Sequence, residues 1–85
     1  MITQLQKAQR FQALHQRDDV FVMPNPWDAA STRLLATLGF EALATTSSGF
    51  AMQHGRPDAT QEVDRAAVLE NCRQICAATD LPVNG

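Results

Sequence analysis

The stretch VFVMPNPWDAASTRLLATLGFEALATTSSG, residues 20–49, decides the fold of this chain. Its apolar run 20–23 is too short for a helix and lies between charged residues and prolines, which predicts a parallel strand buried on both faces. A helical pattern follows and stops at Gly39, a residue suited to the position just after a helix. Residues 41–45 then form a second strand. This order predicts a right-handed βαβ unit.

The start of the helix is marked by polar residues and a proline. Asn25 is expected to cap the helix, with Pro26 in its first position and Asp28 in its third. The proline presets the φ angle, and the polar side chains satisfy the first backbone amides or favour the helix dipole. The predicted apolar face of this helix consists of Ala30, Leu34, Leu35 and Leu38.

Two more helices are predicted on either side of this unit. The first begins with a capping box of Thr3 and Gln6, runs to His15, and has an apolar face made of Leu5, Ala8, Phe11 and Leu14. The second is capped by Asp64, which follows Val63 in a hydrophobic staple. Its apolar stripe consists of Val68, Leu69, Cys72, Ile75 and Cys76.

Residues 80–85 start a third strand after the last of these helices. Helical crossovers between the strands imply that all three are parallel, so the fold class is α/β. A parallel sheet that stops at its third strand leaves a long unpaired edge, and such edges are normally covered. We therefore expect residues 1–85 to be the truncated N-terminal part of a larger α/β domain, with no second domain.

The composition excludes several classes of protein. The chain has 85 residues, of which 45% are hydrophobic and 19% charged, which is typical of a globular domain and not of a disordered tail. Its net charge is −2 and its basic residues do not cluster, so a nucleic-acid partner is not expected. No segment has the character of a signal peptide or a membrane span. These features predict a cytoplasmic location and no membrane partner.

The candidate binding residues follow the second strand, because ligand sites of parallel α/β folds lie at the carboxyl ends of the strands. The turn Ser48-Gly49-Phe50 offers a hydroxyl and successive backbone amides that could cradle an anion. The same residues also suit a solvated turn. Asp58 closes the loop after this strand and could reach a metal ion or its bound water, although it equally suits a turn or a helix cap.

Other chemical motifs are weak or missing from the sequence. Cys72 and Cys76 lie four residues apart, which fits two small apolar residues on one helix face better than a metal or redox pair. The Gly-x-Ser-x-Gly pattern of a nucleophile elbow is broken, because Thr46 occupies the position of its first glycine. The glycine-rich signatures of dinucleotide and P-loop sites are absent as well, so nucleotide binding is not predicted.

Five motifs, taken in chain order, resemble the isocitrate lyase and phosphoenolpyruvate mutase superfamily, especially its methylisocitrate-lyase-like and phosphonomutase-like members. They are VMPNPWDAAS (22–31), LGF (38–40), ATTSSGFA (44–51), GRPD (55–58) and DLPVN (80–84). The resemblance implies a (β/α)₈ TIM barrel preceded by an extra helix. Residues 1–85 would form that helix and the barrel up to the start of strand three, the N-terminal third of a single domain.

The resemblance also implies a substrate site. It assigns the carboxylate or oxyanion of a small 2-oxo or hydroxy acid to Ser48, Gly49 and the amide of Phe50. It assigns to Asp58 a hydrogen bond to water on a Mg²⁺ ion whose direct ligand lies beyond residue 85. Thr46 stands where many members carry a tryptophan or tyrosine against the substrate, so this wall of the pocket would be smaller and more polar.

The implied function is that of a Mg²⁺-dependent lyase or mutase that forms or breaks C–C or P–C bonds through an enolate-like intermediate. The resemblance also implies a homo-oligomer when the protein is complete. The 85 residues hold no complete metal site and no catalytic residue, so we expect no activity from them alone. Two alternatives stay open: a non-catalytic part-barrel that binds ligands or associates with itself, and another βαβ fold such as a flavodoxin-like sheet.

Overall fold

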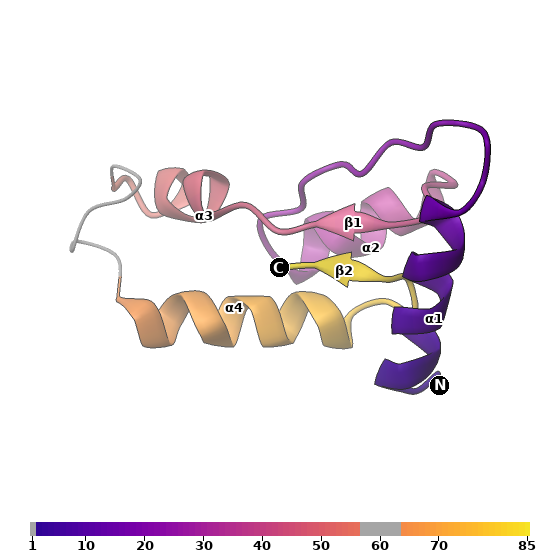
Figure 1. Cartoon of the computed structure of the whole chain (residues 1–85). Coiled ribbons are helices and arrows are strands. Elements are labelled where there is room, and N and C mark those ends of the chain that lie inside the picture. Colours follow the sequence, from indigo (N-terminus) through magenta and orange to yellow (C-terminus); the bar gives the residue numbers. More distant parts are fainter. Residues whose placement is uncertain (1, 57–63) are drawn as a thin grey trace.

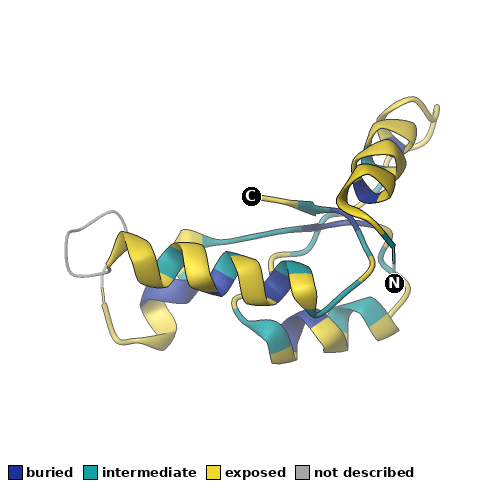
Figure 2. Ribbon diagram, turned by 90° about the horizontal axis from the view of Figure 1, so that it is seen from below, coloured by how far each residue is buried: buried dark blue, intermediate teal, exposed yellow. Residues whose placement is uncertain are grey.

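The computed structural model describes residues 2–56 and 64–85 of the chain. Within these ranges the order of elements is α1 Gln4–His15, α2 Ala29–Thr37, β1 Leu43–Ala44, α3 Ser47–Gln53, α4 Arg65–Ala77 and β2 Val83–Asn84. The two strands lie side by side, with α1 near their N-terminal ends and α3 beyond the carboxyl end of β1 (Figure 1). The helices α2 and α4 contact each other and cover the same side of the strands (Figure 2).

The strands β1 and β2 pair in parallel, with Leu43 opposite Val83 and Ala44 opposite Asn84. The Leu43 amide donates to the Pro82 carbonyl oxygen at 2.9 Å. Because the chain between the strands runs through α4, the parallel pairing needs the helical crossover that the sequence predicts. The α/β class is thereby confirmed.

Residues 20–23 do not form the predicted strand. The segment passes beside β1, and the backbone bond that ties it there runs from the Ala44 amide to the Pro24 carbonyl oxygen at 3.0 Å. Val20 and Val22 are 92% and 66% exposed, so the expectation of a strand buried on both faces is wrong. Proline has no amide to donate, so Pro24 accepts a hydrogen bond from β1 and returns none.

The helix α2 begins later than predicted, at Ala29, with Asp28 rather than Asn25 as its N-cap. Asp28 and Ser31 cap each other: the Ser31 amide donates to Asp28 Oδ1 at 2.8 Å, and the Asp28 amide donates to Ser31 Oγ at 3.2 Å. The Asn25 side chain is engaged elsewhere, because its Nδ2 donates to the Ala44 carbonyl oxygen at 2.9 Å. Asn25 therefore ties the loop before α2 to the carboxyl end of β1.

The predicted apolar faces of α1 and α2 are wrong in part. The buried residues of α1 are Lys7 and Leu14, and those of α2 are Ser31 and Thr32. Thr32 tolerates burial because its hydroxyl donates to the Asp28 carbonyl oxygen at 2.7 Å. Several residues expected to face inward are exposed instead: Leu5, Ala8, Ala30, Leu34 and Leu38.

Other helix ends confirm the sequence analysis. The capping box at Thr3 is present, Gly39 has a φ angle of 91° just after α2, and Asp64 caps α4. Val63, the first residue of the predicted staple, lies outside the described residues. Leu69 is exposed, but the rest of the α4 stripe is buried or half-buried, at Val68, Cys72, Ile75 and Cys76.

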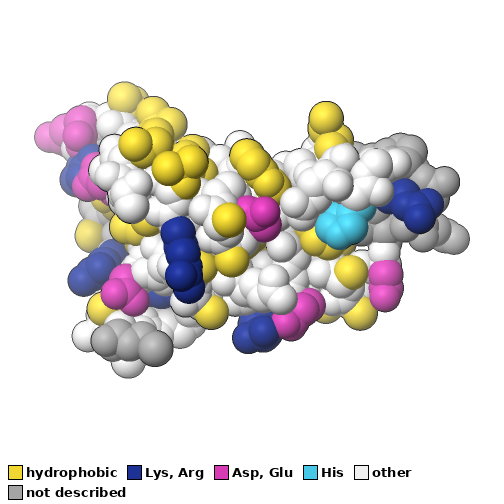
Figure 3. All heavy atoms as spheres, turned by 180° about the vertical axis from the view of Figure 1, so that it is seen from behind, with side chains coloured by type: hydrophobic (Ala, Val, Ile, Leu, Met, Phe, Trp, Pro, Cys, Tyr) yellow, Lys and Arg dark blue, Asp and Glu magenta, His cyan; other side chains and the backbone are white. Residues whose placement is uncertain are grey.

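The core is small and lies between the strands and α4, where Leu43 and Ile75 are completely buried. Apolar side chains remain on the surface, and Figure 3 shows several of them on the face behind the view of Figure 1. No helix among the described residues has the length and hydropathy that crossing a bilayer requires. The large exposed apolar residues are Leu5, Val20, Val22, Trp27, Leu34, Leu38, Met52 and Leu69.

An ion pair links the end of α1 to the start of β1. Arg17 Nη1 donates to Glu41 Oε2 at 2.6 Å, and Arg17 Nη2 donates to Glu41 Oε1 at 3.0 Å. These hydrogen bonds from Arg17 lower the pKa of Glu41 below its ordinary value. A carboxyl group with a lowered folded-state pKa stabilises the fold above its unfolded pKa, and this contribution disappears as the pH falls through the folded pKa.

Glu41→Gln should therefore reduce the loss of stability on acidification. We expect wild-type protein to lose more free energy of unfolding than the variant across that acidic range, in urea titrations followed by circular dichroism. Glu70→Gln, which breaks a pair with Arg73 inside α4, is the matched control for a pair within one helix. The same acid dependence in wild type and Glu41→Gln would show that the Arg17–Glu41 pair does not link α1 to β1 energetically.

Candidate functional site

The carboxyl ends of the two strands meet at one edge of the pair, where β1 leads into α3 and β2 ends at Asn84. A cavity of about 280 Å³ lies at this edge. Its walls are residues 45–47 after β1, Phe50 of α3, Asn71 and its neighbours on α4, and Gly85. A hollow at the carboxyl ends of parallel strands is the expected place for a ligand in an α/β protein.

The residues Ser48, Gly49 and Phe50 lie in the first turn of α3, and not in the loop turn that the sequence predicts. Thr46 caps this helix, because its Oγ1 accepts a hydrogen bond from the Gly49 amide at 3.0 Å. The Phe50 amide donates to the Thr46 carbonyl oxygen at 3.1 Å. The expectation that the amides at 49 and 50 are open donors is therefore wrong in this structure. Ser48 keeps an exposed side chain.

Gly49 has no room for a side chain on the side of Thr46, and Trp27 lies at ordinary contact distance from it. A Cβ atom there would lie 2.7 Å from Thr46 Cγ2 and 3.4 Å from Trp27 Cβ. The first distance is shorter than ordinary carbon contacts, so even a methyl group needs the Thr46 side chain to move. Trp27 precedes α2 and is 46% exposed.

Asn71 on α4 is a site residue that the sequence analysis missed. It is 9% exposed, and its Nδ2 donates to the Trp27 carbonyl oxygen at 2.9 Å. Gln53 Nε2 approaches the same oxygen at 3.4 Å. The sequence does contain one signal for this residue. Asn71 is an amide directly before Cys72, on the side of α4 that carries the apolar stripe.

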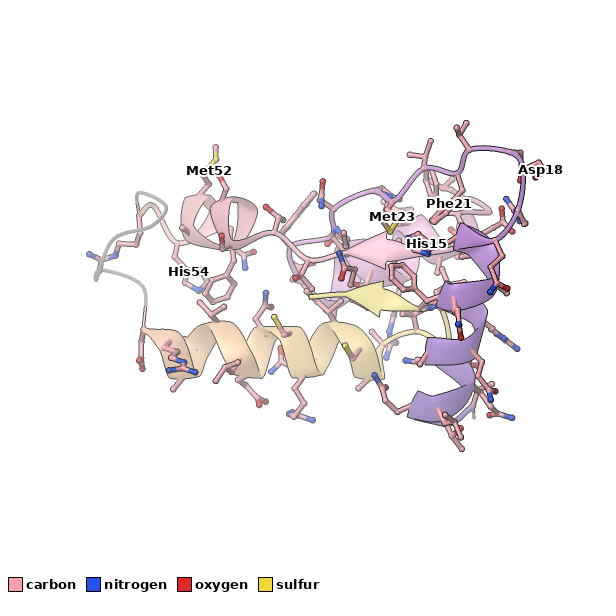
Figure 4. All side chains as sticks on the ribbon, in the orientation of Figure 1. His15, Asp18, Phe21, Met23, Met52 and His54 are labelled. Carbon is pink, nitrogen blue, oxygen red and sulfur yellow. The ribbon has the colours of Figure 1, made fainter. Side chains whose placement is uncertain are left out.

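Met52 of α3 and His54, the residue just after this helix, differ in their position relative to α4. His54 lies on the side of α3 that faces α4, whereas Met52 points away from it (Figure 4). The His54 ring is 4.6 Å from the Phe50 ring, and its Nδ1 lies 2.9 Å from the Phe50 carbonyl oxygen. His54 lines a groove between α3 and α4, beside the strand-end cavity and not within its walls.

The metal prediction falls largely outside the part of the chain that the structure describes, because Asp58 is not among those residues. Within residues 2–56 and 64–85, no three histidine, cysteine, aspartate or glutamate residues gather closely enough to hold a metal ion. Magnesium prefers carboxylate oxygens, and the walls of the strand-end cavity carry hydroxyl, amide and thiol groups instead. The described residues therefore do not make a magnesium site by themselves.

Parallel strands joined by helices, with a cavity at their carboxyl ends, define an α/β protein of the ligand-binding or enzyme class. The model of the phosphoenolpyruvate phosphomutase family matches residues 11–85. The chain belongs to that family, which confirms the resemblance to the isocitrate lyase and phosphoenolpyruvate mutase superfamily.

Solved structures of similar proteins agree with this assignment. A candidate lyase/mutase from Burkholderia cenocepacia J2315 is 51% identical, with a TM-score of 0.85 over 92% of this chain and 27% of its own. A candidate phosphonomutase from the same strain is 38% identical, with a TM-score of 0.82 over 92% of this chain and 31% of its own. The chain therefore spans less than a third of these solved proteins.

Two uncharacterised proteins of Mycobacterium tuberculosis, from strains CDC 1551 / Oshkosh and ATCC 25618 / H37Rv, are also similar. Each is 42% identical over 48 residues, which is 56% of this chain and 19% of the relative. The chain thus spans about a fifth of these curated relatives. Family and neighbours together identify a piece of a lyase/mutase-type protein.

Proposed function

We propose that these residues are the N-terminal third of a (β/α)₈ barrel enzyme, a Mg²⁺-dependent lyase or mutase that forms or breaks C–C or P–C bonds of small 2-oxo or hydroxy acids. The observation that carries the proposal is the 51% identity and TM-score of 0.85 to a candidate lyase/mutase, together with the cavity at the strand ends. The complete protein would be a cytoplasmic homo-oligomer without nucleic-acid or membrane partners.

In this proposal the first turn of α3 binds the substrate carboxylate or enolate oxygen. Ser48 offers an exposed hydroxyl in this turn, and the amides of Gly49 and Phe50 close the turn on Thr46, after the end of β1. Thr46 forms the small polar wall of the pocket and orients the turn through its bond to the Gly49 amide. Magnesium would stabilise the developing enolate charge when bound, with Asp58 bonded to one of its waters.

Calorimetry on the natural gene product, with Mg²⁺ and pyruvate as the simplest 2-oxo acid, tests this function. We expect saturable pyruvate binding in the presence of Mg²⁺, and binding about tenfold weaker in Ser48→Ala, since one hydrogen bond to a charged group is lost. Thr37→Val removes an exposed hydroxyl at the far end of α2 and should bind pyruvate like the wild type. Equal affinity in wild type and Ser48→Ala would remove the carboxylate role from Ser48.

Exposed apolar residues favour the second candidate, a non-catalytic part-barrel that associates with itself. Val20 and Val22 are largely exposed beside β1, where a second chain would cover them. Intact mass and sedimentation of the natural gene product separate the two candidates. A mass near 9.3 kDa, self-association and no response to Mg²⁺ or pyruvate would support the assembly role and contradict the enzyme.

A further inference from the structure

Asn71 stands between the two hollows on the α3 side of the molecule. It lines the strand-end cavity of about 280 Å³ and also the groove of about 450 Å³ between α3 and α4. Its side chain is more than nine-tenths buried, although asparagine is usually exposed. A buried amide requires hydrogen-bond partners, and its Nδ2 finds one in the carbonyl oxygen of Trp27 at 2.9 Å.

The backbone of Trp27 is held from three helices. Asn71 of α4 and Gln53 of α3 approach its carbonyl oxygen, at 2.9 and 3.4 Å, and its amide donates to Ser31 Oγ of α2 at 3.0 Å. The short contact is the one from Asn71, which comes from a position 44 residues along the chain. Asn71 therefore ties the loop that leads into α2 to α4, in addition to the tie that Asn25 makes to β1.

The side chain of Trp27 begins directly against the candidate substrate turn. Its Cβ lies 3.4 Å from the point that a Cβ on Gly49 would occupy, so the two positions are direct neighbours. Trp27 remains 46% exposed beside the first turn of α3. Any shift of the Trp27 backbone would therefore change the surroundings of Ser48 and Gly49.

We propose that Asn71 is a positioning residue for the substrate site: it holds Trp27 against Gly49 and so fixes the wall beside the carboxylate-binding turn. The inference rests on the proposed function for its substrate, but the tie itself is independent of that function. A leucine has the same number and branching of side-chain heavy atoms as asparagine, but it cannot donate to the Trp27 carbonyl. Without this hydrogen bond we expect Trp27 to move away from Gly49, and the affinity for a small 2-oxo acid to fall.

Fluorescence of Trp27 and pyruvate binding together test this role on the natural gene product. Trp27 is the one tryptophan among these 85 residues, and subtraction of the Trp27→Phe spectrum isolates its emission. We expect Asn71→Leu to shift the Trp27 emission to longer wavelength and to weaken pyruvate binding about tenfold. Gln74→Leu, an exposed amide lining the same groove, should change neither quantity.

A second variant keeps the test decisive if Asn71→Leu does not fold. Asn71→Asp preserves size and polarity, but its carboxylate cannot donate to the Trp27 carbonyl, so the same emission shift and weaker binding are expected. Unchanged emission and affinity in a folded Asn71 variant would overturn the inference. Absence of pyruvate binding in the wild type would instead overturn the proposed substrate, while the Trp27 emission would still decide whether Asn71 positions this loop.

Discussion

Replacing Lys7 by methionine is expected to lower the free energy of unfolding by about 2–4 kcal/mol, since hydrogen bonds to charged groups contribute about 1.5–3 kcal/mol each. Lys7 lies on α1 and is 8% exposed. Its Nζ donates to the Cys76 carbonyl oxygen at 2.7 Å and to the Thr79 carbonyl oxygen at 2.6 Å, at the carboxyl end of α4. A cation is favoured there by the helix dipole as well.

Methionine isolates this effect because it keeps the unbranched length of lysine without the donors. The variant leaves two carbonyl oxygens at the end of α4 without their ammonium partner, and α1 loses its polar tie to α4. Urea unfolding followed by circular dichroism measures the loss. Arg33→Met removes an exposed cation on α2 and should stay within about 0.5 kcal/mol of wild type. A Lys7→Met midpoint as high as that of Arg33→Met would contradict the tie.

Three helix ends were predictable from sequence because their signals are local. Thr3, Gly39 and Asp64 act through residues within one turn of themselves, so their roles follow from spacing alone. Which face of a helix is buried depends on distant partners. Lys7 belongs to the polar face of α1 by pattern, yet it is buried because the end of α4 supplies two acceptors.

The segments before the prolines and after β1 show the limits of propensity. The sequence Ser-Ser-Gly favours a turn, because all three residues are weaker helix formers than alanine, and yet α3 forms there. Its start depends on Thr46, whose cap lacks the glutamate or glutamine of a full capping box. The run 20–23 was predicted to be a buried strand and is not one. Its apolar composition predicts burial, but burial requires neighbours that the described residues do not provide.

The place of the candidate site was predictable, but its hydrogen bonds were not. Ligand sites of parallel α/β folds lie at the carboxyl ends of the strands, and this rule predicts residues 46–50. That the Gly49 amide already has an acceptor in Thr46 depends on a side-chain rotamer, which spacing does not specify. Asn71 was missed because its partner is the Trp27 carbonyl. Every residue has a backbone carbonyl, so no sequence pattern identifies this one as an acceptor.

Gly49→Ala is expected to cost about 1–2 kcal/mol of stability, although alanine is the better helix former. Overpacking lowers the free energy of unfolding by about 1–3 kcal/mol, and the higher helix propensity of alanine offsets about 0.5–1 kcal/mol of this loss. The new methyl group would stand 2.7 Å from Thr46 Cγ2. If Thr46 turns aside to make room, its Oγ1 leaves the Gly49 amide and the cap of α3 is lost instead.

Thr46→Ser separates these causes because it removes the clashing methyl group and keeps the capping hydroxyl. Serine caps a helix as well as threonine does, so Thr46→Ser alone should change stability by less than about 1 kcal/mol. In that background Gly49→Ala should be neutral or stabilising, since the remaining contacts of the added carbon, at 3.4 and 3.5 Å, are ordinary. Urea unfolding of all four proteins gives the coupling energy, expected to be about 1–2 kcal/mol. The same cost of Gly49→Ala in both backgrounds would show that Thr46 Cγ2 is not what requires glycine at position 49.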